Sequence, residues 1–405
     1  MKKAIFILLY INAIFNISIA QTKVGGPVSG IWDHTNSPYL VNDDDIIISN
    51  GDTLIIKPGV EVVFNSGGFE FTVYGTLLAE GTSDSLIVFR GAIDNPGIWN
   101  GIHFFVPDSS NKLAFCLIKN AGGDADAAVK ISCNDESKLT ISNSIIMKNY
   151  ANGITINQGD SLVIRQCNIL NNRGNGVYYS PGDKSGSPNL TSNIIINNDE
   201  FGIVNDGKSN MCYNLVWNNR NGNFLDSFKE PHVPLGVLTG TNSNGDSCDS
   251  KTNISFDPLF VDLQNDNFHL RKDSPCINAG DLFMPQDPDG TQADIGVYYY
   301  DTSIEDLPGS TTNNVLARPN PFTPNNDGFN DYVKFDFPSV TENSFEILIF
   351  DVSGKKVATL SSAVSRNNQW YGTDDKGNKM APGVYIYIIK INGSTEYNGT
   401  ITLIR

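Results

Sequence analysis

Five segments decide the fold of this chain: CLIKN at 116–120, IIMKN at 145–149, NILNN at 168–172, IIINN at 194–198 and LVWNN at 215–219. Each segment ends in asparagine, and successive asparagines are 29, 23, 26 and 21 residues apart. Apolar residues stand two and three positions before every one of these asparagines. Glycine follows four of them at a near-fixed offset, at 153, 176, 202 and 222, and short β-prone runs come next.

A period of about 20–30 residues with short β-prone runs is typical of a solenoid. One coil of a parallel β-helix needs about this many residues, and coils stack about 4.8 Å apart, so equivalent residues form ladders. We expect the apolar ladders to fill the interior. Asparagine suits a corner because it tolerates left-handed backbone angles and can hydrogen-bond along its own ladder. Leucine-rich repeats have similar periods, but they need a regular leucine spacing that is absent here.

The flanking sequence continues the alternation of apolar and polar positions, in GDTLIIKPGVEVVF at 51–64 and VYGTLLAEGT at 73–82. These stretches and WNGIHF at 99–104 resemble the opening of secreted bacterial right-handed β-helix proteins. The stretches DPLF at 257–260 and DPDGTQADIG at 287–296 resemble their closing segment. The resemblance covers roughly residues 30–300 and implies the pectate-lyase-like superfold. That superfold hosts lyases, hydrolases, adhesins and phage-type spikes, so fold alone does not give function.

The last ninety residues have a different pattern: PNPFTPNNDGFND at 319–331, FEILIFDVSGKKV at 345–357, WYG at 370–372, GVYIY at 383–387 and LIR at 403–405. Short alternating runs between Gly, Asp and Pro turns predict a small β-sandwich. The motifs resemble the immunoglobulin-like C-terminal sorting domains of the type IX secretion system, closest to the gliding-motility-associated kind. This resemblance implies export across the outer membrane of a Gram-negative, Bacteroidota-type bacterium, with the secretion machinery as partner. The alternative is an ordinary accessory sandwich.

The first twenty residues have the composition of a secretory signal peptide. Lys2 and Lys3 precede an apolar run, and small residues stand before an expected cleavage point after Ala20. An uncleaved membrane anchor is disfavoured because the run is short and contains Asn12 and Asn16. We find no later segment that is long and apolar enough to span a bilayer. The chain is therefore expected on the outer cell surface or in the medium.

Charge supports a division into two domains. The 405 residues carry 44 acidic and 28 basic side chains, a net charge of −16. Residues 21–315 hold 35 acidic and 17 basic side chains, whereas residues 316–405 hold nine of each. An acidic chain without clustered Lys and Arg is excluded as a nucleic-acid binder. The predicted organisation is all-β: a signal peptide at 1–20, a right-handed parallel β-helix at 21–302, a linker at 303–315 and an immunoglobulin-like sandwich at 316–405.

One candidate site follows the corner asparagines. If the coils stack, Arg173, Asp199 and Arg220 form a column of alternating charge. The resemblance to β-helix lyases, which use an Arg or Lys base and calcium against a uronate, implies a site for an acidic sugar. The alternative is a ladder of surface ion pairs, each contributing at most about 1 kcal/mol. Two carboxyls about 6.5–9.5 Å apart would permit inverting hydrolysis. Candidate carboxyls are Asp199 and Glu200 with Asp206, or Asp124 with Asp126.

Calcium is the expected metal, because hard oxygen ligands on Gly-containing loops suit it. One candidate loop contains Asn325, Asp327, Asn330 and Asp331, and a second contains Asp287, Asp289 and Asp294. The alternative for the first loop is a hydrogen-bonded turn without metal. We find no HExxH pair, nucleophile elbow, phosphate loop or dinucleotide fingerprint in the sequence.

The chain has six cysteines, at 116, 133, 167, 212, 248 and 276. Cys116 and Cys167 fall in the repeat strands and are predicted to be buried. A disulfide between Cys248 and Cys276, or from Cys212, is an open alternative, because an exported chain passes an oxidising compartment.

Two hypotheses follow from the sequence. The first is a non-catalytic surface or secreted β-helix that binds glycans or mediates adhesion. The second is a lyase or glycoside hydrolase that acts on an acidic polysaccharide through Arg173, Asp199 and Arg220.

Overall fold

The computed structural model describes residues 21–105, 110–132, 138–158, 161–181, 186–228 and 233–301, and parts of 316–403, namely 316–318, 322, 324, 332–336, 345–361, 368–391 and 394–403. The chain divides into two compact units, Met1–Ser303 and Ile304–Arg405. The predicted signal peptide and linker lie outside the described residues. In the described part of the chain, the regular elements are strands apart from one 3-10 turn, η1, at His34–Asn36, and turns and loops connect them.

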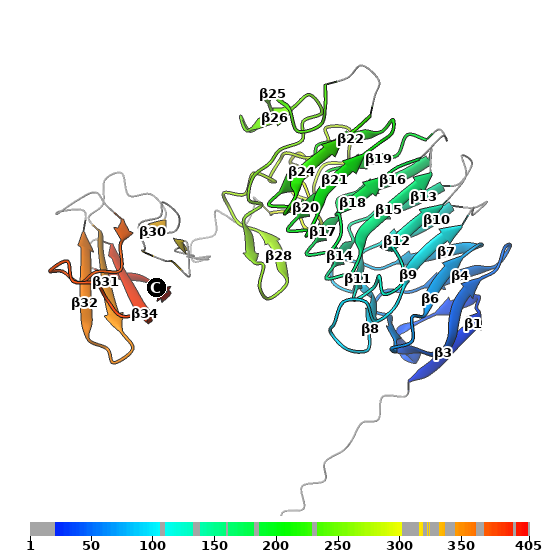
Figure 1. Ribbon diagram of the computed structural model, residues 1–405, viewed down its shortest axis with the longest axis horizontal. Coiled ribbons are helices and arrows are strands. Elements are labelled where there is room, and N and C mark those ends of the chain that lie inside the picture. Colours follow the sequence, from blue (N-terminus) through cyan, green and yellow to red (C-terminus); the bar gives the residue numbers. More distant parts are fainter. Residues whose placement is uncertain are drawn as a thin grey trace, which may run out of the picture. The chain divides into compact units, whose positions relative to one another are not determined.

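The first unit is a parallel β-helix with three faces, as the repeat predicted (Figure 1). Face one contains β5 (Glu61–Phe64), β8 (Ile87–Gly91), β11 (Cys116–Lys119), β14 (Ile145–Met147), β17 (Asn168–Leu170), β20 (Ile194–Ile196) and β23 (Leu215–Trp217). Face two contains β6 (Glu70–Val73), β9 (Gly101–Phe105), β12 (Ala127–Ser132), β15 (Asn152–Gln158), β18 (Val177–Tyr179), β21 (Phe201–Asn205) and β24 (Gly222–Asp226).

Face three is a separate sheet of β2 (Gly30–Trp32), β4 (Thr53–Ile56), β7 (Thr76–Glu80), β10 (Ser110–Ala114), β13 (Lys138–Ser142), β16 (Ser161–Arg165), β19 (Asn189–Thr191) and β22 (Asn210–Cys212). Faces one and two join through β3 (Tyr39–Ile48), which pairs with β5 at its start and β6 at its end. The strand β1 (Thr22–Pro27) pairs with β3 in parallel. The first coils are therefore tied together by one long strand.

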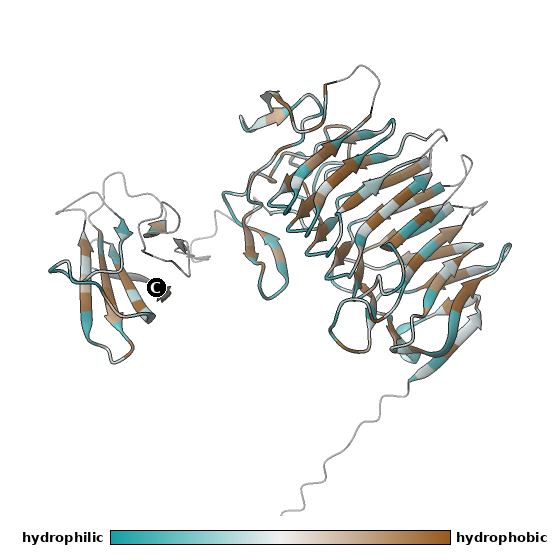
Figure 2. Ribbon diagram, in the orientation of Figure 1, coloured by the Kyte–Doolittle hydropathy of each residue, from teal (hydrophilic) through white to brown (hydrophobic). Residues whose placement is uncertain are grey.

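The interior holds the apolar ladders that the alternation predicted. In β9, Ile102 and Phe104 are buried in the core, while His103 and Phe105 point away from it. Figure 2 shows hydrophobic residues concentrated on the strands of the stack. Trp99 of the WNGIHF stretch is fully buried and stacks on Phe64, with ring centroids 4.0 Å apart.

A ladder of buried asparagines lies at the corner between faces one and two. The Nδ2 amide of one asparagine donates a hydrogen bond to the Oδ1 of the asparagine on the next coil, with N–O distances of 2.8, 3.0 and 2.9 Å along the ladder. Its members are Asn149, Asn172, Asn198 and Asn219. The ladder satisfies polar groups that would otherwise be unpaired inside the corner. The expected role of asparagine is thus confirmed for hydrogen bonding.

Two details of the corner differ from what the five aligned repeat segments predicted. Asn120 is one residue out of register, because Ile118 pairs with Ile146 and Ala121 takes the ladder position. The left-handed angle belongs to the residue before the ladder asparagine, with φ of 54° at Lys148. The equivalent values at 171, 197 and 218 are 55°, 56° and 53°.

The glycines at 153, 176 and 202 lie above one another on successive coils, and the coils stack too closely there for a larger residue. A Cβ on Gly176 would lie 2.6 Å from the carbonyl oxygen of Gly202 on the next coil. Gly153 faces Gly176 in the same way, at 2.7 Å. Gly222 is not in this column, since it pairs with Phe201 rather than with Gly202.

A second polar ladder, which the sequence did not predict, lies between faces three and one. It runs through Asn193, Asn214 and Asn253, with Nδ2–Oδ1 distances of 2.9 and 3.0 Å. Cys116 and Cys167 occupy the equivalent position on earlier coils, where their N–H groups donate to the Ser144 hydroxyl and to Asn193 Oδ1.

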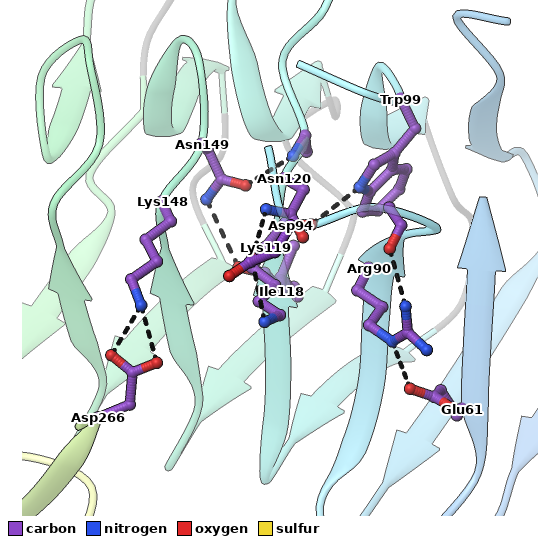
Figure 3. Close-up of polar contacts among 12 residues, drawn as sticks. Glu61, Arg90, Asp94, Trp99, Ile118, Lys119, Asn120, Lys148, Asn149 and Asp266 are labelled. Carbon is purple, nitrogen blue, oxygen red and sulfur yellow. Dashed lines mark hydrogen bonds and ion pairs between the residues drawn. The ribbon is translucent and has the colours of Figure 1, made fainter. Parts of the chain in front are cut away.

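The segment 254–300 closes the unit by packing against the outside of face one. Met147, Leu170 and Ile196 point outward from their strands and form one cluster with Ile295 and Val297. The sequence predicted that Met147, Leu170 and Ile196 would lie inside the coil, and this prediction is wrong. The residues directly before them, at 146, 169 and 195, do lie inside. The Lys148 ammonium also binds both carboxylate oxygens of Asp266, at 2.9 and 2.8 Å (Figure 3). The segment includes the antiparallel pair β27 (Phe260–Asp262) and β28 (Asn267–Leu270), and β25 (Leu238–Thr241) pairs with β26 (Ser247–Asp249) before it.

The second unit consists of two antiparallel sheets, as the sandwich prediction required. One contains β29 (Leu316–Arg318), β30 (Val333–Asp336) and β33 (Gln369–Trp370), and the other contains β31 (Phe345–Asp351), β32 (Lys356–Ser361), β34 (Gly383–Ile391) and β35 (Ser394–Leu403). The sheets share a core in which Trp370 meets Tyr385 edge-on, with ring centroids 5.1 Å apart.

Candidate functional site

The asparagine corner also fixes the residue that follows it. The backbone N–H of Arg173 donates to the carbonyl of Asn149 on the previous coil at 2.9 Å, and the equivalent bonds of the next two coils are 2.9 and 3.0 Å. Because the asparagines are buried and the following residues are exposed, those side chains are presented to solvent on successive coils. The side chains presented in this way are Tyr150, Arg173, Asp199 and Arg220.

These side chains surround an open pocket of about 470 Å³, which we call the corner pocket. It is lined by Tyr150, Arg173, Asp199, Glu200, Arg220 and Asn221. The structure therefore brings together all three members of the column that the sequence singled out.

The column is not a ladder of ion pairs. Among the described residues, no carboxylate lies within 4.0 Å of the Arg173 or Arg220 guanidinium. Arg173 instead lies over the ring of Tyr150, which is half exposed. Two guanidinium groups thus remain available to a ligand in the corner pocket.

Glu200 and Asn221 line the corner pocket, and the sequence argument did not connect them with Arg173. The Asn175 amide donates to the Glu200 carboxylate at 2.7 Å, and the Asn221 N–H donates to the Glu200 carbonyl at 3.1 Å. Both residues stand two positions after a ladder asparagine, so an alignment extended by one residue would have found them.

The arrangement suits an anionic sugar. Guanidinium groups form paired hydrogen bonds with carboxylates, and an exposed tyrosine ring offers an apolar face. The carboxylates of Asp199 and Glu200 can accept hydrogen bonds from hydroxyl groups.

The other carboxylate candidates lie elsewhere. Asp206 is exposed and does not line the corner pocket. Asp126 pairs with Lys130 at 2.9 Å, and the Asp124 N–H donates to the Asn100 amide oxygen. Neither Asp124 nor Asp126 lines the corner pocket.

The calcium candidates Asp287, Asp289 and Asp294 belong to a loop of the closing segment. The two oxygens of Asp294 accept the N–H groups of Asn278 and Tyr300, both at 2.7 Å. Asp287 accepts the Asp294 N–H at 2.9 Å, and Asp289 accepts the Thr291 hydroxyl at 2.7 Å. The loop is therefore organised by its own hydrogen bonds.

Burial, with a smaller contribution from neighbouring carboxylates, raises the pKa of Asp294 to about 7 and that of Asp287 to about 6. In the described part of the chain, no group of three or more His, Cys, Asp or Glu side chains is placed to hold a metal. The first calcium candidate loop, with Asn325, Asp327, Asn330 and Asp331, lies outside the described residues.

All five described cysteines are free and buried, so the alternative of a disulfide from Cys248, Cys276 or Cys212 is wrong in this structure. Cys133 lies outside the described residues. The prediction that Cys116 and Cys167 are buried is confirmed. Burial raises the pKa of the Cys167 thiol to about 12, and burial also raises the pKa of the Cys116 thiol.

The fold and the corner pocket define a parallel β-helix protein with an exposed polar site on its corner. Right-handed β-helix regions match residues 31–185 and 92–233, which together span half of the chain. The chain belongs to the right-handed β-helix family.

Residues 316–403 match the CHU_C type IX secretion signal domain, which implies contact with that machinery and delivery to the cell surface or exterior. No curated protein matches the chain. Within the part that the structure describes, we find no helix long and apolar enough to cross a membrane.

Proposed function

We propose that this exported β-helix protein binds an acidic polysaccharide at the corner pocket without cleaving it. The observation that carries the proposal is that Arg173 and Arg220, which form no ion pair with any described carboxylate, line one open pocket beside an exposed tyrosine. A charge-assisted hydrogen bond contributes roughly 1.5–3 kcal/mol, so two of them can hold a uronate carboxylate.

Retention in gels that contain acidic or neutral polysaccharides tests this proposal. We expect retention by polyuronates, and we expect Arg173→Gln and Arg220→Gln each to weaken it about tenfold or more, as the loss of one such bond requires. Lys57→Gln is the matched control, because it removes one exposed positive charge from another coil. Equal retention of all variants would sink the proposal.

Cleavage at the same pocket is the second candidate function. It is favoured by one observation, the placement of Asp199 and Glu200 beside the two arginines. New reducing ends would report a hydrolase, and unsaturated products would report a lyase. Either activity, if abolished by Arg173→Gln, would replace simple binding as the function of the pocket.

We further propose a Bacteroidota-type host, cleavage after Ala20 and sorting through residues 316–405. Mass spectrometry of the exported protein should show a chain that starts at Gln21. Deletion of residues 316–405 should leave the chain in the periplasm, and normal export of the deleted chain would contradict the sorting role.

Calcium remains a proposal at both candidate loops. Its binding by residues 325–331 or 287–294 should raise the melting temperature in calcium over that in chelator. An unchanged melting temperature would contradict calcium binding at these loops.

A further inference from the structure

A second polar cluster lies on the outer side of face two, in the early coils, and does not include the corner-pocket residues. Strands β6, β9 and β12 are neighbours there, with His103 paired to Thr72 on one side and to Lys130 on the other. Phe71, Ile102 and Ile131 point into the core, so the alternation turns Glu70, His103 and Ser132 outward. These three side chains come from three successive coils.

The three side chains form a continuous relay. Glu70 Oε1 lies 3.5 Å from His103 Nδ1, and His103 Nε2 lies 3.1 Å from Ser132 Oγ. In the tautomer that carries its proton on Nδ1, the imidazole can donate toward the Glu70 carboxylate, and Nε2 can accept the serine proton. This is the order of roles in an acid–histidine–serine triad, which is recognised by geometry rather than by position in the chain.

The surroundings hold the relay in place. The His103 ring packs against Phe105, with centroids 3.6 Å apart, and Phe105 stacks on Tyr74. The Thr72 hydroxyl donates to Glu70 Oε2 at 3.2 Å. The hydrogen bond from His103 lowers the pKa of Glu70, which keeps this carboxylate ionised.

A neighbouring cation is held by its own carboxylate partner. Lys130, beside His103 in the ladder, pairs with Asp126 at 2.9 Å. On the serine side, the Asn157 amide donates to Ser132 Oγ at 3.4 Å. An amide donor beside the nucleophile can stabilise the negative charge that develops on an acyl oxygen.

We propose that Ser132, His103 and Glu70 form a hydrolytic site for carboxylic esters. Ser132 Oγ attacks the acyl carbon while its proton passes to His103 Nε2. The tetrahedral intermediate expels the alcohol, which takes that proton, and leaves an acyl group on Ser132. Water then repeats the sequence, releases the carboxylic acid and restores the serine hydroxyl. Ser132 and His103 are the catalytic residues, and Glu70 is a positioning residue.

Covalent labelling of the purified full chain with a fluorophosphonate tests the nucleophile. We expect mass spectrometry to find the label on Ser132, and we expect Ser132→Ala and His103→Gln to abolish it. Ser110→Ala, at an exposed serine on face three, is the matched control and should keep the label. Circular dichroism of each variant should match that of the parent chain.

Turnover of p-nitrophenyl acetate tests the reaction. Ser132→Ala and His103→Gln should lower kcat at least a hundredfold. Glu70→Gln should lower kcat about tenfold or more with KM unchanged, which a merely structural role would not produce. Absence of label from Ser132, or hydrolysis that persists in Ser132→Ala, overturns the proposal. Neither result bears on polysaccharide retention at the corner pocket.

Discussion

The guanidinium of Arg173 lies over the ring of Tyr150, with its Cζ atom 4.9 Å from the ring centroid. The two residues stand on successive coils, each directly after a ladder asparagine. The contact orients the arginine without neutralising it, because an aromatic face attracts a cation but carries no net charge. Tyr150 thus orients the Arg173 guanidinium and also contributes an apolar surface to the corner pocket.

Tyr150→Ala should weaken polysaccharide retention about two- to fivefold, because an exposed cation–π contact contributes about 0.5–1 kcal/mol. Tyr150→Phe should retain parental affinity, since the ring face rather than the hydroxyl makes the contact. Tyr299→Ala, at an exposed tyrosine outside the corner pocket, is the control. Parental retention by Tyr150→Ala would contradict this role.

Asn172→Ala should lower the free energy of unfolding by about 2–4 kcal/mol, because it removes one rung and leaves buried partners unsatisfied. The Asn172 amide donates to Asn198 Oδ1 and to the Ile146 carbonyl, at 3.0 and 3.2 Å. Asn210→Ala, at an exposed asparagine, should change stability by about 0.5 kcal/mol or less. Urea titration followed by circular dichroism measures both, and equal effects would refute the ladder argument.

Ile295→Ala should loosen the closing segment, because Ile295 is fully buried against the outside of face one. Removal of such a side chain costs about 2–5 kcal/mol. Hydrogen exchange should rise in residues 254–300 and stay unchanged in β4, β7 and β9. Ile93→Ala, at an exposed isoleucine, is the control. A uniform rise along all coils would show that the segment does not open separately.

The closing segment should be more stable at pH 5 than at pH 8. Burial raises the pKa of Asp294 to about 7 and that of Asp287 to about 6. A raised carboxyl pKa means that the folded state binds protons more tightly than the unfolded chain. The resulting stability is fully present below the unfolded pKa and is lost as pH rises through about 6–7.

Melting temperatures measured from pH 5 to pH 8 check this dependence. Asp294→Asn should flatten the profile in that range, whereas Asp273→Asn, at an exposed carboxylate, should leave it unchanged. A melting temperature that rises with pH through 6–7 would contradict the assignment.

Cys116, Cys167 and Cys276 should resist alkylation in the native protein. All three thiols are fully buried, and burial raises their pKa, so neither access nor thiolate formation favours reaction. Alkylation followed by mass spectrometry should find them unmodified in buffer and modified in denaturant. Reaction in buffer, or a disulfide-linked peptide, would contradict the structure.

The β-helix was predictable because its signal is local and repeated. Four successive coils place an apolar residue inside and an asparagine at the corner, so the fold was predictable even though the segment at Asn120 is one residue out of register. The second polar ladder was missed because Cys116, Ser144, Cys167 and Asn193 share a position but not a residue type. A ladder of mixed side chains has no visible period.

The two candidate sites differ in how far the sequence revealed them. Arg173, Asp199 and Arg220 keep the same offset from a ladder residue, so stacking alone predicts their column. Glu70, His103 and Ser132 have no common offset, and they meet only because the registers of β6, β9 and β12 set His103 diagonally between the other two. No motif search would join them.

The sequence by itself determined the repeat, the corner asparagines, the charge of each part and the motifs of the C-terminal domain, because each depends on residues close together in the chain. Only the tertiary structure decided which apolar residues face inward, that segment 254–300 covers the outside of face one, and which side chains meet across coils. These outcomes depend on strand register. A shift of one residue turns every side chain of a strand to the opposite face, and composition does not encode that choice.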